Sequence, residues 1–446
     1  MTTQLEITYK YFLAIMLLFY ILLGLCACDS DRYDDLDSQT TAKFLTGSIT
    51  ATKATPEVEK TITPSLSLTA SLIPPTKTPT PSITVLDSSP TPSKLSDIDQ
   101  ELTIIDEFPG DGTYEGLLVL RGSENPGIIF NLATGQVQLF PFDEESEASL
   151  GRALVSPDNQ KIVYSEPDFD NNARLFTIKS FEPGGASNQH ILDDLWWFVE
   201  TWTVENRLLL SKECAVYLLL DPENGAREPF HVDLPNQLDP RGQGWGASLY
   251  CPVVSPDLSR VVYLGEPDMG AYAIIVLWDL ESNQRLLRLT SGNNPWGGEP
   301  VWSRDGNSFI LTLDNSTPDE LFKVTKNGEV TQLTHLGDIF TKRLIIQSYE
   351  LSPDNNQIAF WMWYGWDKYV TEQRFAVHNL LTEETTIYNL QGYEHSSPVW
   401  SPEGDAVVIV SYINDEKVIL LVDLSKNVAY KIAGDYYPVG WLVSNP

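Results

Sequence analysis

The chain has 446 residues and a formal net charge of -32 at pH 7, from 61 acidic and 29 basic residues. Binding to nucleic acid needs clustered Lys and Arg, so this charge argues against nucleic acid as a partner. It equally opposes electrostatic adhesion to an anionic membrane surface.

Residues 1–28 are predicted to form an export signal. The segment Tyr11–Leu25 is apolar almost throughout but is short for a membrane span, as in the core of a signal peptide. It ends in Leu25-Cys26-Ala27-Cys28, which resembles a bacterial lipoprotein box and implies a lipid on Cys28, because the small Ala27 precedes it. An uncleaved signal anchor and full secretion are the alternatives. All three place the rest of the chain outside the cytoplasm.

Residues 29–107 are predicted to form a disordered tether. They are rich in Thr, Ser and Pro, with Pro79-Thr80-Pro81-Ser82 and Pro90-Thr91-Pro92-Ser93 as the clearest runs. Such a composition buries too little apolar surface to offset the entropy of ordering. Pro-rich chain favours polyproline II at roughly 3.1 Å per residue. The tether is therefore expected to hold the following domain away from the membrane.

Residues 108–446 read as an all-β domain built from a repeat. An apolar pair followed by Ser-Pro-Asp, or a close variant, recurs about every 48 residues. The copies are Leu154–Asp158, Val253–Asp257, Val301–Asp305, Glu350–Asp354 and Val399–Glu403, with a weaker copy at Thr201–Glu205. An apolar strand follows each copy. This period is typical of a β-propeller in which each repeat is one four-stranded blade.

The repeats predict a seven-bladed propeller of four-stranded antiparallel blades. Six inner strands begin near the six copies, and three further strands before the first copy lack an inner partner. Tyr437–Val443 has the pattern of an inner strand with nothing after it. We expect this C-terminal strand to complete the first blade, because ring closure leaves no exposed inner edge.

The turn after each copy has its own signature. The residue after the acid often needs a positive φ, and this position holds residues that tolerate it: Asn159, Asn206, Gly306, Asn355 and Gly404. Leu258 is the exception and predicts a different turn there.

The phrases Pro300–Gly306 and Pro398–Gly404 resemble the repeat of TolB-type propellers, which reads roughly Pro-x-Trp-Ser-Pro-Asp-Gly. The pairs Leu289-Thr290 and Leu333-Thr334 match the Leu-Thr that closes blades in that family. The resemblance implies a binding propeller outside the cytoplasm. TolB carries an α/β domain before its propeller and works with the Tol-Pal system, whereas this chain has a lipidation site and a tether in that place.

No catalytic motif stands out. The sequence lacks a Gly-x-Ser-x-Gly elbow, a P-loop, a dinucleotide-binding fingerprint and, after the signal, HExxH or CxxC patterns. We therefore expect no catalytic residue, metal or cofactor. The main rival is an enzyme, because some polysaccharide lyases resemble TolB-type propellers and use metal-bound His in the central funnel. That resemblance would point to His335 and His395, with Glu299 or Glu394 nearby.

Loops that join consecutive blades, and those between second and third strands, are expected to open on one face. They are rich in aromatic residues beside acids, which suits stacking on a glycan or contact with a peptide. The candidate ligand-binding residues are Trp196, Trp197, Trp245, Trp296, Trp366, Tyr369, Glu299 and His395. The alternative is that these Trp side chains pack over blade edges. Trp302, Trp400 and Trp441 lie on inner strands and are expected in the core.

Cys214 and Cys251 fall on the same face of adjacent predicted blades. A disulfide is chemically permitted outside the cytoplasm, and two buried free thiols are the alternative. Together these features predict a lipid-anchored, non-catalytic binding protein with a protein or glycan ligand at the cell envelope. A purely structural envelope scaffold is the third alternative.

Overall fold

A computed structural model describes residues 95–122, 127–140, 153–168, 175–181, 189–195, 197–212, 216–232, 252–265, 274–290, 299–314, 319–340, 343–365, 372–392 and 396–443. All of them belong to one unit of the chain, Leu86–Pro446. This part of the chain is all-β apart from the short 3-10 helix η2 (Leu336–Asp338). No helix within these ranges is long and apolar enough to cross a membrane. The predicted signal and residues 29–94 of the tether lie outside the described residues.

Four sheets each take four consecutive antiparallel strands. Their strands are β6 (Ala153–Val155), β7 (Ile162–Asp168), β8 (Leu175–Phe181) and β9 (Gln189–Leu195); β10 (Trp197–Trp202), β11 (Leu208–Lys212), β12 (Val216–Leu220) and β13 (Arg227–Phe230); β14 (Val253–Val254), β15 (Arg260–Gly265), β16 (Ile274–Asp279) and β17 (Gln284–Thr290); and β18 (Val301–Trp302), β19 (Ser308–Asp314), β20 (Asp319–Thr325) and β21 (Val330–Gln332).

A fifth four-stranded sheet joins the two ends of the domain. It contains β31 (Tyr436–Leu442), β3 (Leu117–Gly122), β4 (Ile128–Asn131) and β5 (Val137–Leu139), in that order. β31 runs antiparallel to β3, from Leu117 opposite Leu442 to Gly122 opposite Tyr436. The C-terminal strand therefore completes the first sheet, as the unpartnered inner-strand pattern predicts.

Two sheets depart from the four-stranded antiparallel form. The first contains β22 (Arg343–Leu351), β23 (Gln357–Gly365), β24 (Glu372–Asn379) and β25 (Glu384–Tyr388), with β1 (Leu95–Gln100) added in parallel to β25. The second contains β26 (Gln391–Gly392), β27 (Val399–Trp400), β28 (Ala406–Ile413), β29 (Glu416–Asp423) and β30 (Val428–Gly434), with β2 (Thr103–Ile105) added in parallel to β30.

These added strands correct two expectations. The uniform seven-blade pattern of four antiparallel strands is wrong for these two sheets and holds for the other five. Two segments assigned to the disordered tether, Leu95–Gln100 and Thr103–Ile105, form strands instead. The tether composition conceals the β-branched run Thr103-Ile104-Ile105, and a strand this short forms because it adds to an existing sheet edge.

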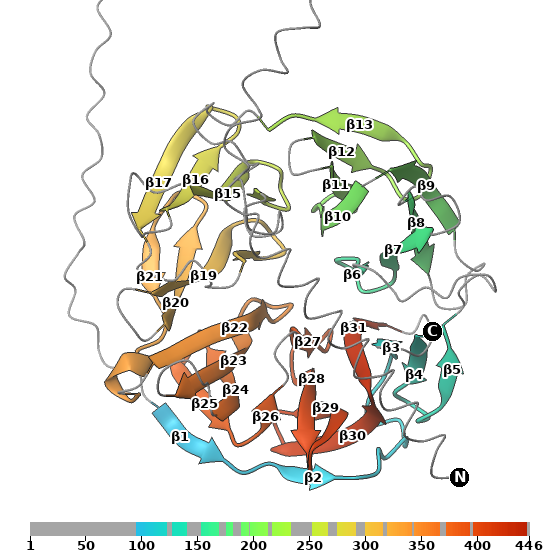
Figure 1. Cartoon of the computed structure of the whole chain (residues 1–446), viewed down its shortest axis with the longest axis vertical. Helices are drawn as coiled ribbons and strands as arrows, with labels where there is room; N and C mark the ends of the chain where they lie inside the picture. The colour runs from blue at the N-terminus through green and yellow to red at the C-terminus, as the bar shows by residue number, and fades with distance from the viewer. Residues whose placement is uncertain are drawn as a thin grey trace, which may run out of the picture. The chain divides into compact units, whose positions relative to one another are not determined.

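The hydrophobic core lies between the sheets rather than within them. Seven clusters of buried side chains each join two neighbouring sheets, and the succession of clusters returns to its starting sheet. In β28, Val407 and Ile409 face the β22–β25 sheet, while Val408 and Val410 face the β3–β5 sheet. This alternation follows from the two-residue period of a strand. The sheets follow one another around a centre (Figure 1).

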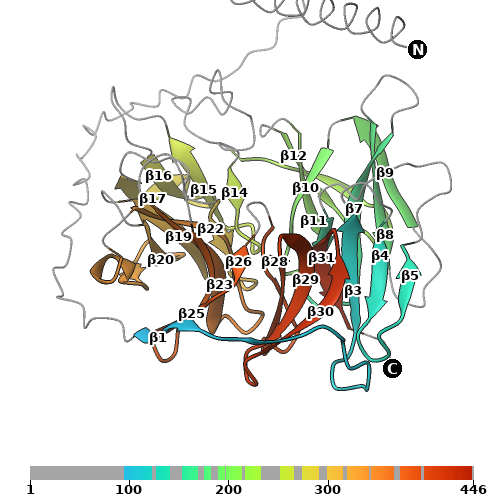
Figure 2. The ribbon, with the colours of Figure 1, turned by 60° about the horizontal axis from the view of Figure 1, so that its bottom comes forward.

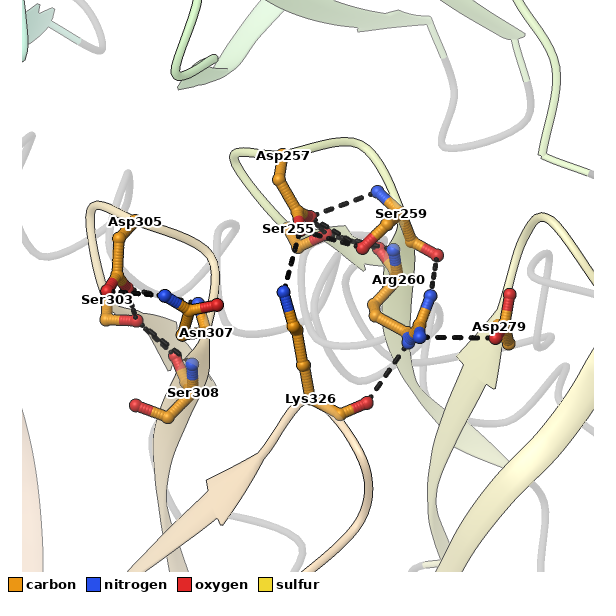
Figure 3. A network of polar contacts seen from close by, with 10 residues as sticks. All are labelled: Ser255, Asp257, Ser259, Arg260, Asp279, Ser303, Asp305, Asn307, Ser308 and Lys326. Carbon is orange, nitrogen blue, oxygen red and sulfur yellow. Dashed lines mark hydrogen bonds and ion pairs between the residues drawn. The ribbon is translucent and has the colours of Figure 1, made fainter.

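Each repeat turns tightly after its inner strand. In the copy beginning at Val301, the Ser303 hydroxyl donates to Asp305 at 2.6 Å and accepts from the Ser308 amide at 3.0 Å. Figure 3 shows this turn beside the turn of the preceding sheet, where Ser255 and Asp257 make the same contact. These side-chain bonds satisfy backbone and carboxylate groups that have no strand partner where the chain reverses.

The Leu258 turn is not different from the others, so that expectation is wrong. Leu258 adopts φ +58° and its amide donates to the Ser255 carbonyl at 2.8 Å, matching Asn159 at φ +55° and its bond to Ser156. The hydrogen bonds of Ser255 and Asp257 and the pairing of the neighbouring strands define the turn. Leu258 therefore adopts a positive φ, although leucine rarely does so.

Candidate functional site

The inner strands place one distinctive carboxylate near the centre of the ring. The position before the Trp of the repeat holds apolar, small or hydroxyl residues in six sheets: Leu154, Thr201, Val253, Val301, Val399 and Gly440. In β22 the same position holds Glu350, which is half-buried. Burying a charge without full compensation is unfavourable, so a charge at this repeat position needs a reason other than packing.

The side chain of Arg304, in the turn after an inner strand, reaches across the centre of the ring. Arg304 stands where four other copies carry a proline: Pro157, Pro256, Pro353 and Pro402. Its Nη1 donates to the Pro157 carbonyl at 3.1 Å, and its Nη2 donates to Asn159 Oδ1 at 3.4 Å. Arg304 follows β18 and Pro157 follows β6, and at least two other sheets separate these strands in either direction around the ring.

Glu350 and Arg304 influence one another's charge. Burial raises the pKa of Glu350 to about 7, and the Arg304 guanidinium opposes this rise. Burial lowers the pKa of Arg304, and Glu350 opposes that fall. The centre therefore presents one carboxylate that titrates near neutrality and one guanidinium held by the opposite sheet. Such a pair can bind a polar ligand or exchange a proton with one.

Bulges orient further polar groups along two inner strands. The β10–β11 register shifts between Val199 and Thr201, which leaves Glu200 as the extra residue, and Glu200 accepts a hydrogen bond from the Ser211 hydroxyl. The β22–β23 register shifts just before Glu350, where Ser348 adopts φ +49°. Bulges of this kind redirect side chains and occur often beside functional sites.

Only part of the predicted aromatic face lies within the described residues. Trp197 is 8% exposed and packs in the core between the β6–β9 and β10–β13 sheets, so the packing alternative holds for it. Glu299 is exposed, and its carbonyl accepts from the Tyr349 hydroxyl at 2.7 Å. The other predicted positions lie outside the described residues: Trp196, Trp245, Trp296, Trp366, Tyr369, His395, Cys28, Cys214 and Cys251.

The remaining inner-strand tryptophans lie in the core, as the sequence predicts. Trp400 and Trp441 are 6% and 4% exposed, and Trp302 is partly buried against the cluster between the β14–β17 and β18–β21 sheets.

The residues named for a lyase-like metal site do not converge where they are described. His335 follows the outer strand β21, and its Nδ1 lies 3.1 Å from Gln332 Nε2. Glu299 precedes the inner strand β18 of the same sheet, so the two residues stand at opposite edges of the sheet. Across the described ranges, no group of three or more His, Cys, Asp or Glu is placed to hold a metal ion.

The repeat motif does not identify Glu350 and Arg304 as candidate site residues. Both Glu350 and Arg304 fall inside copies of the repeat, and the motif is defined by the residues that the copies share. The signal that identifies these two residues is the difference between the copies. Each of the two is a charged residue at a position where the other copies hold uncharged ones.

No protein-family model matches the sequence, and no curated protein matches it. Similar solved structures include TolB from Acinetobacter baumannii, with 16% identity over 72% of this chain and 81% of TolB, at a TM-score of 0.40. An oligogalacturonate lyase in complex with manganese has 10% identity over 72% of this chain and 86% of the lyase, at a TM-score of 0.47.

A puromycin-hydrolyzing peptidase from Mycobacterium tuberculosis has 12% identity over 76% of this chain and 55% of the peptidase, at a TM-score of 0.46. Identities and TM-scores at this level carry no information about activity, because one fold serves many functions.

Proposed function

We propose that this protein is a non-catalytic binding propeller, held outside the cytoplasm by a lipid on Cys28, that takes a protein or glycan ligand. In this proposal the seven sheets are the blades of one closed ring, and the ligand meets the ends of the inner strands. The observation that carries the proposal is that Glu350 and Arg304 place two charges near the ring centre, at repeat positions where the other copies hold uncharged residues.

A purely structural ring has no need of these charges. Glu350 is half-buried and Arg304 is exposed, and charges that are open to solvent contribute little to stability, so these two charges are weak support for stability alone. Groups with perturbed pKa values are candidates for ligand contact. In the proposal, Glu299 and the predicted loop residues Trp245 and Trp296 supply the outer part of the same site.

Ligand binding can be tested on residues 29–446, which lack the predicted signal and the lipid, by thermal shift against a glycan array and a peptide library, with divalent metals and EDTA as a separate arm. A ligand that binds only the folded state raises the melting temperature. We expect a rise with a glycan or peptide that is lost in Glu350→Gln and Trp296→Ala but kept in Glu205→Gln, which changes an exposed turn carboxylate.

Other outcomes favour the rivals. A rise that survives both site variants would place the ligand elsewhere. A rise with a metal alone, lost in His395→Ala, would favour the lyase-like enzyme. No rise with any compound would favour a folded protein partner or the scaffold.

The anchor can be tested separately by growing cells that express the full chain with a labelled fatty acid. We expect incorporation to be lost in Cys28→Ala and retained in Cys26→Ala, which changes the neighbouring thiol and leaves the small residue before Cys28 in place. Label that disappears only in Cys26→Ala would move the lipid to that residue, and no label in the unmodified chain would favour an uncleaved anchor or secretion.

A further inference from the structure

The N-terminal end of the described chain is fastened along the outside of the ring before it enters the first sheet. β1 lies parallel to β25 and β2 lies parallel to β30, the outer strands of two neighbouring sheets (Figure 2). The chain then reaches β3. Residues 95–116 therefore run along the edges of the last two sheets in the sequence and lead into the first.

The fastening is weaker at its outer end. The β1–β25 pairing is irregular, with register shifts between Leu95 and Asp97 and again between Asp97 and Gln100. The β2–β30 pairing is shorter but regular, with Thr103, Ile104 and Ile105 opposite consecutive residues of β30. The Thr103 amide also donates to the Asn427 carbonyl at 3.2 Å. Register shifts interrupt ladder bonds, so β1 is the part that separates more easily.

Side chains lock the segment after β2. Phe108 packs against the cluster between the β26–β30 and β3–β5 sheets, with its ring 5.3 Å from that of Phe130. Tyr114 is buried in the same cluster, and its hydroxyl donates to Asp423 at 2.6 Å. Lys426 donates to the same carboxylate at 2.8 Å and lies 5.2 Å from the centre of the Tyr114 ring.

These contacts protect the joint that closes the ring. β3 begins three residues after Tyr114, and β3 also pairs with the C-terminal strand β31. A pull from the N-terminal side would act on that joint if nothing intervened. Because Tyr114, β2 and β1 are all fixed to other strands, the pull has to separate them in turn first.

We propose that residues 95–114 form a graded clasp that takes up tension from the N-terminal side before the tension reaches the β3–β31 joint. Under load β1 peels from β25 first, while β2, Phe108 and Tyr114 still hold. The biological use of the clasp rests on the proposed lipid anchor, which would make the tether the place where force is applied. The clasp itself does not depend on the lipid.

Single-molecule pulling of residues 29–446 between the N-terminal end and an azide-bearing residue in place of the exposed Glu205, which lies outside β31 and the first sheet, tests the clasp. We expect an early extension before the cooperative opening of the ring. The contour length that this step releases is that of the six residues of β1, about 20 Å at roughly 3.3–3.6 Å per extended residue. The matched control attaches the N-terminal handle at position 107 through an azide-bearing residue in place of the exposed Glu107, which bypasses β1 and β2.

The early extension is expected to vanish with the handle at position 107. Tyr114→Phe keeps the ring but removes the hydroxyl bond to Asp423, so we expect the opening force to fall while the early extension is unchanged. Opening in one step with both handle positions would overturn the clasp, as would an early extension that persists with the handle at 107. Fatty-acid labelling of Cys28 gives an independent answer on the anchor, so the two proposals can fail separately.

Discussion

The indole nitrogen of Trp302 donates a hydrogen bond to the carbonyl oxygen of Val253, 3.2 Å away in the preceding sheet. Trp400 makes the same bond to Glu350 at 3.1 Å, and Trp202 makes it to Leu154 at 3.3 Å. The tryptophan that defines the repeat therefore links consecutive sheets through a backbone carbonyl as well as through packing.

We expect Trp302→Phe to destabilise the protein because the Val253 carbonyl loses its indole donor while most of the apolar ring is kept. A net hydrogen bond contributes about 0.5–1.5 kcal/mol, and the smaller ring adds to the loss. The control is Trp278→Phe, whose indole donates to Asn283 in an exposed contact within one sheet. Urea unfolding of both variants measures the difference, and equal losses would show that the link between sheets contributes nothing.

Gly306→Ala tests the contact between neighbouring turns. Gly306 has φ +69°, and an added Cβ would lie 2.9 Å from Asp257 Cγ in the preceding sheet. Gly225 has φ +71° with nothing within 4 Å of a Cβ, so Gly225→Ala carries the backbone strain alone. That strain is about 1 kcal/mol. We expect the Gly306 variant to lose more stability by chemical denaturation; equal losses would mean that the Asp257 side chain moves aside freely.

Glu350 predicts a specific pH dependence. Burial raises its pKa to about 7 in the folded protein, partly offset by Arg304, whereas the pKa of a Glu in an unfolded chain is about 4.3. The folded state holds this proton more tightly, so its contribution to stability is present below about pH 4 and is lost as pH rises towards 7.

Glu350→Gln is therefore expected to flatten the fall in melting temperature between pH 5 and pH 8. Glu205→Gln, at an exposed turn position, is the control and is expected to leave the profile unchanged. A Glu350→Gln profile that parallels the unmodified chain would show that Glu350 titrates in the folded protein as it does in the unfolded chain.

Removal of β31 is expected to abolish cooperative unfolding. The deletion of residues 436–446 exposes the inner edge of β3 and removes Trp441 and Leu442 from the clusters on either side of the first sheet. A chain ending at Val443 keeps β31 and serves as the control. Circular dichroism and calorimetry of the two chains measure the effect, and a sharp transition in the shorter chain would mean that the ring closes without this strand.

Much of the fold was predictable because its determinants are local. The period of the repeat, the Ser-Pro-Asp turns and the apolar strands place most inner strands and the closure by β31. β1 and β2 were not predictable in the same way. Parallel addition to a distant edge leaves no periodic signal, and the Thr/Ser/Pro composition around Leu95 resembles disordered chain.

The candidate site was less accessible to the sequence. Loop position alone assigned Trp197 to a binding face, but β10 turns this side chain into the core, and the bulge at Glu200 decides which residues face inward. Arg304 and Glu350 needed a comparison of the copies for their differences. Even then, only the ring geometry shows that Arg304 reaches Pro157, 147 positions earlier in the chain.

Because each cluster belongs to two sheets, the two faces of every sheet depend on different neighbours. In β28, Val407 is matched to residues of the β22–β25 sheet and Val408 to residues of the β3–β5 sheet. Alternate side chains of a strand point to opposite faces. A volume change on one face can be compensated only by residues of the preceding repeat, and a change on the other face only by residues of the following repeat. A repeat moved to another position in the ring would therefore meet two unmatched surfaces, so the copies are not interchangeable despite their common motif.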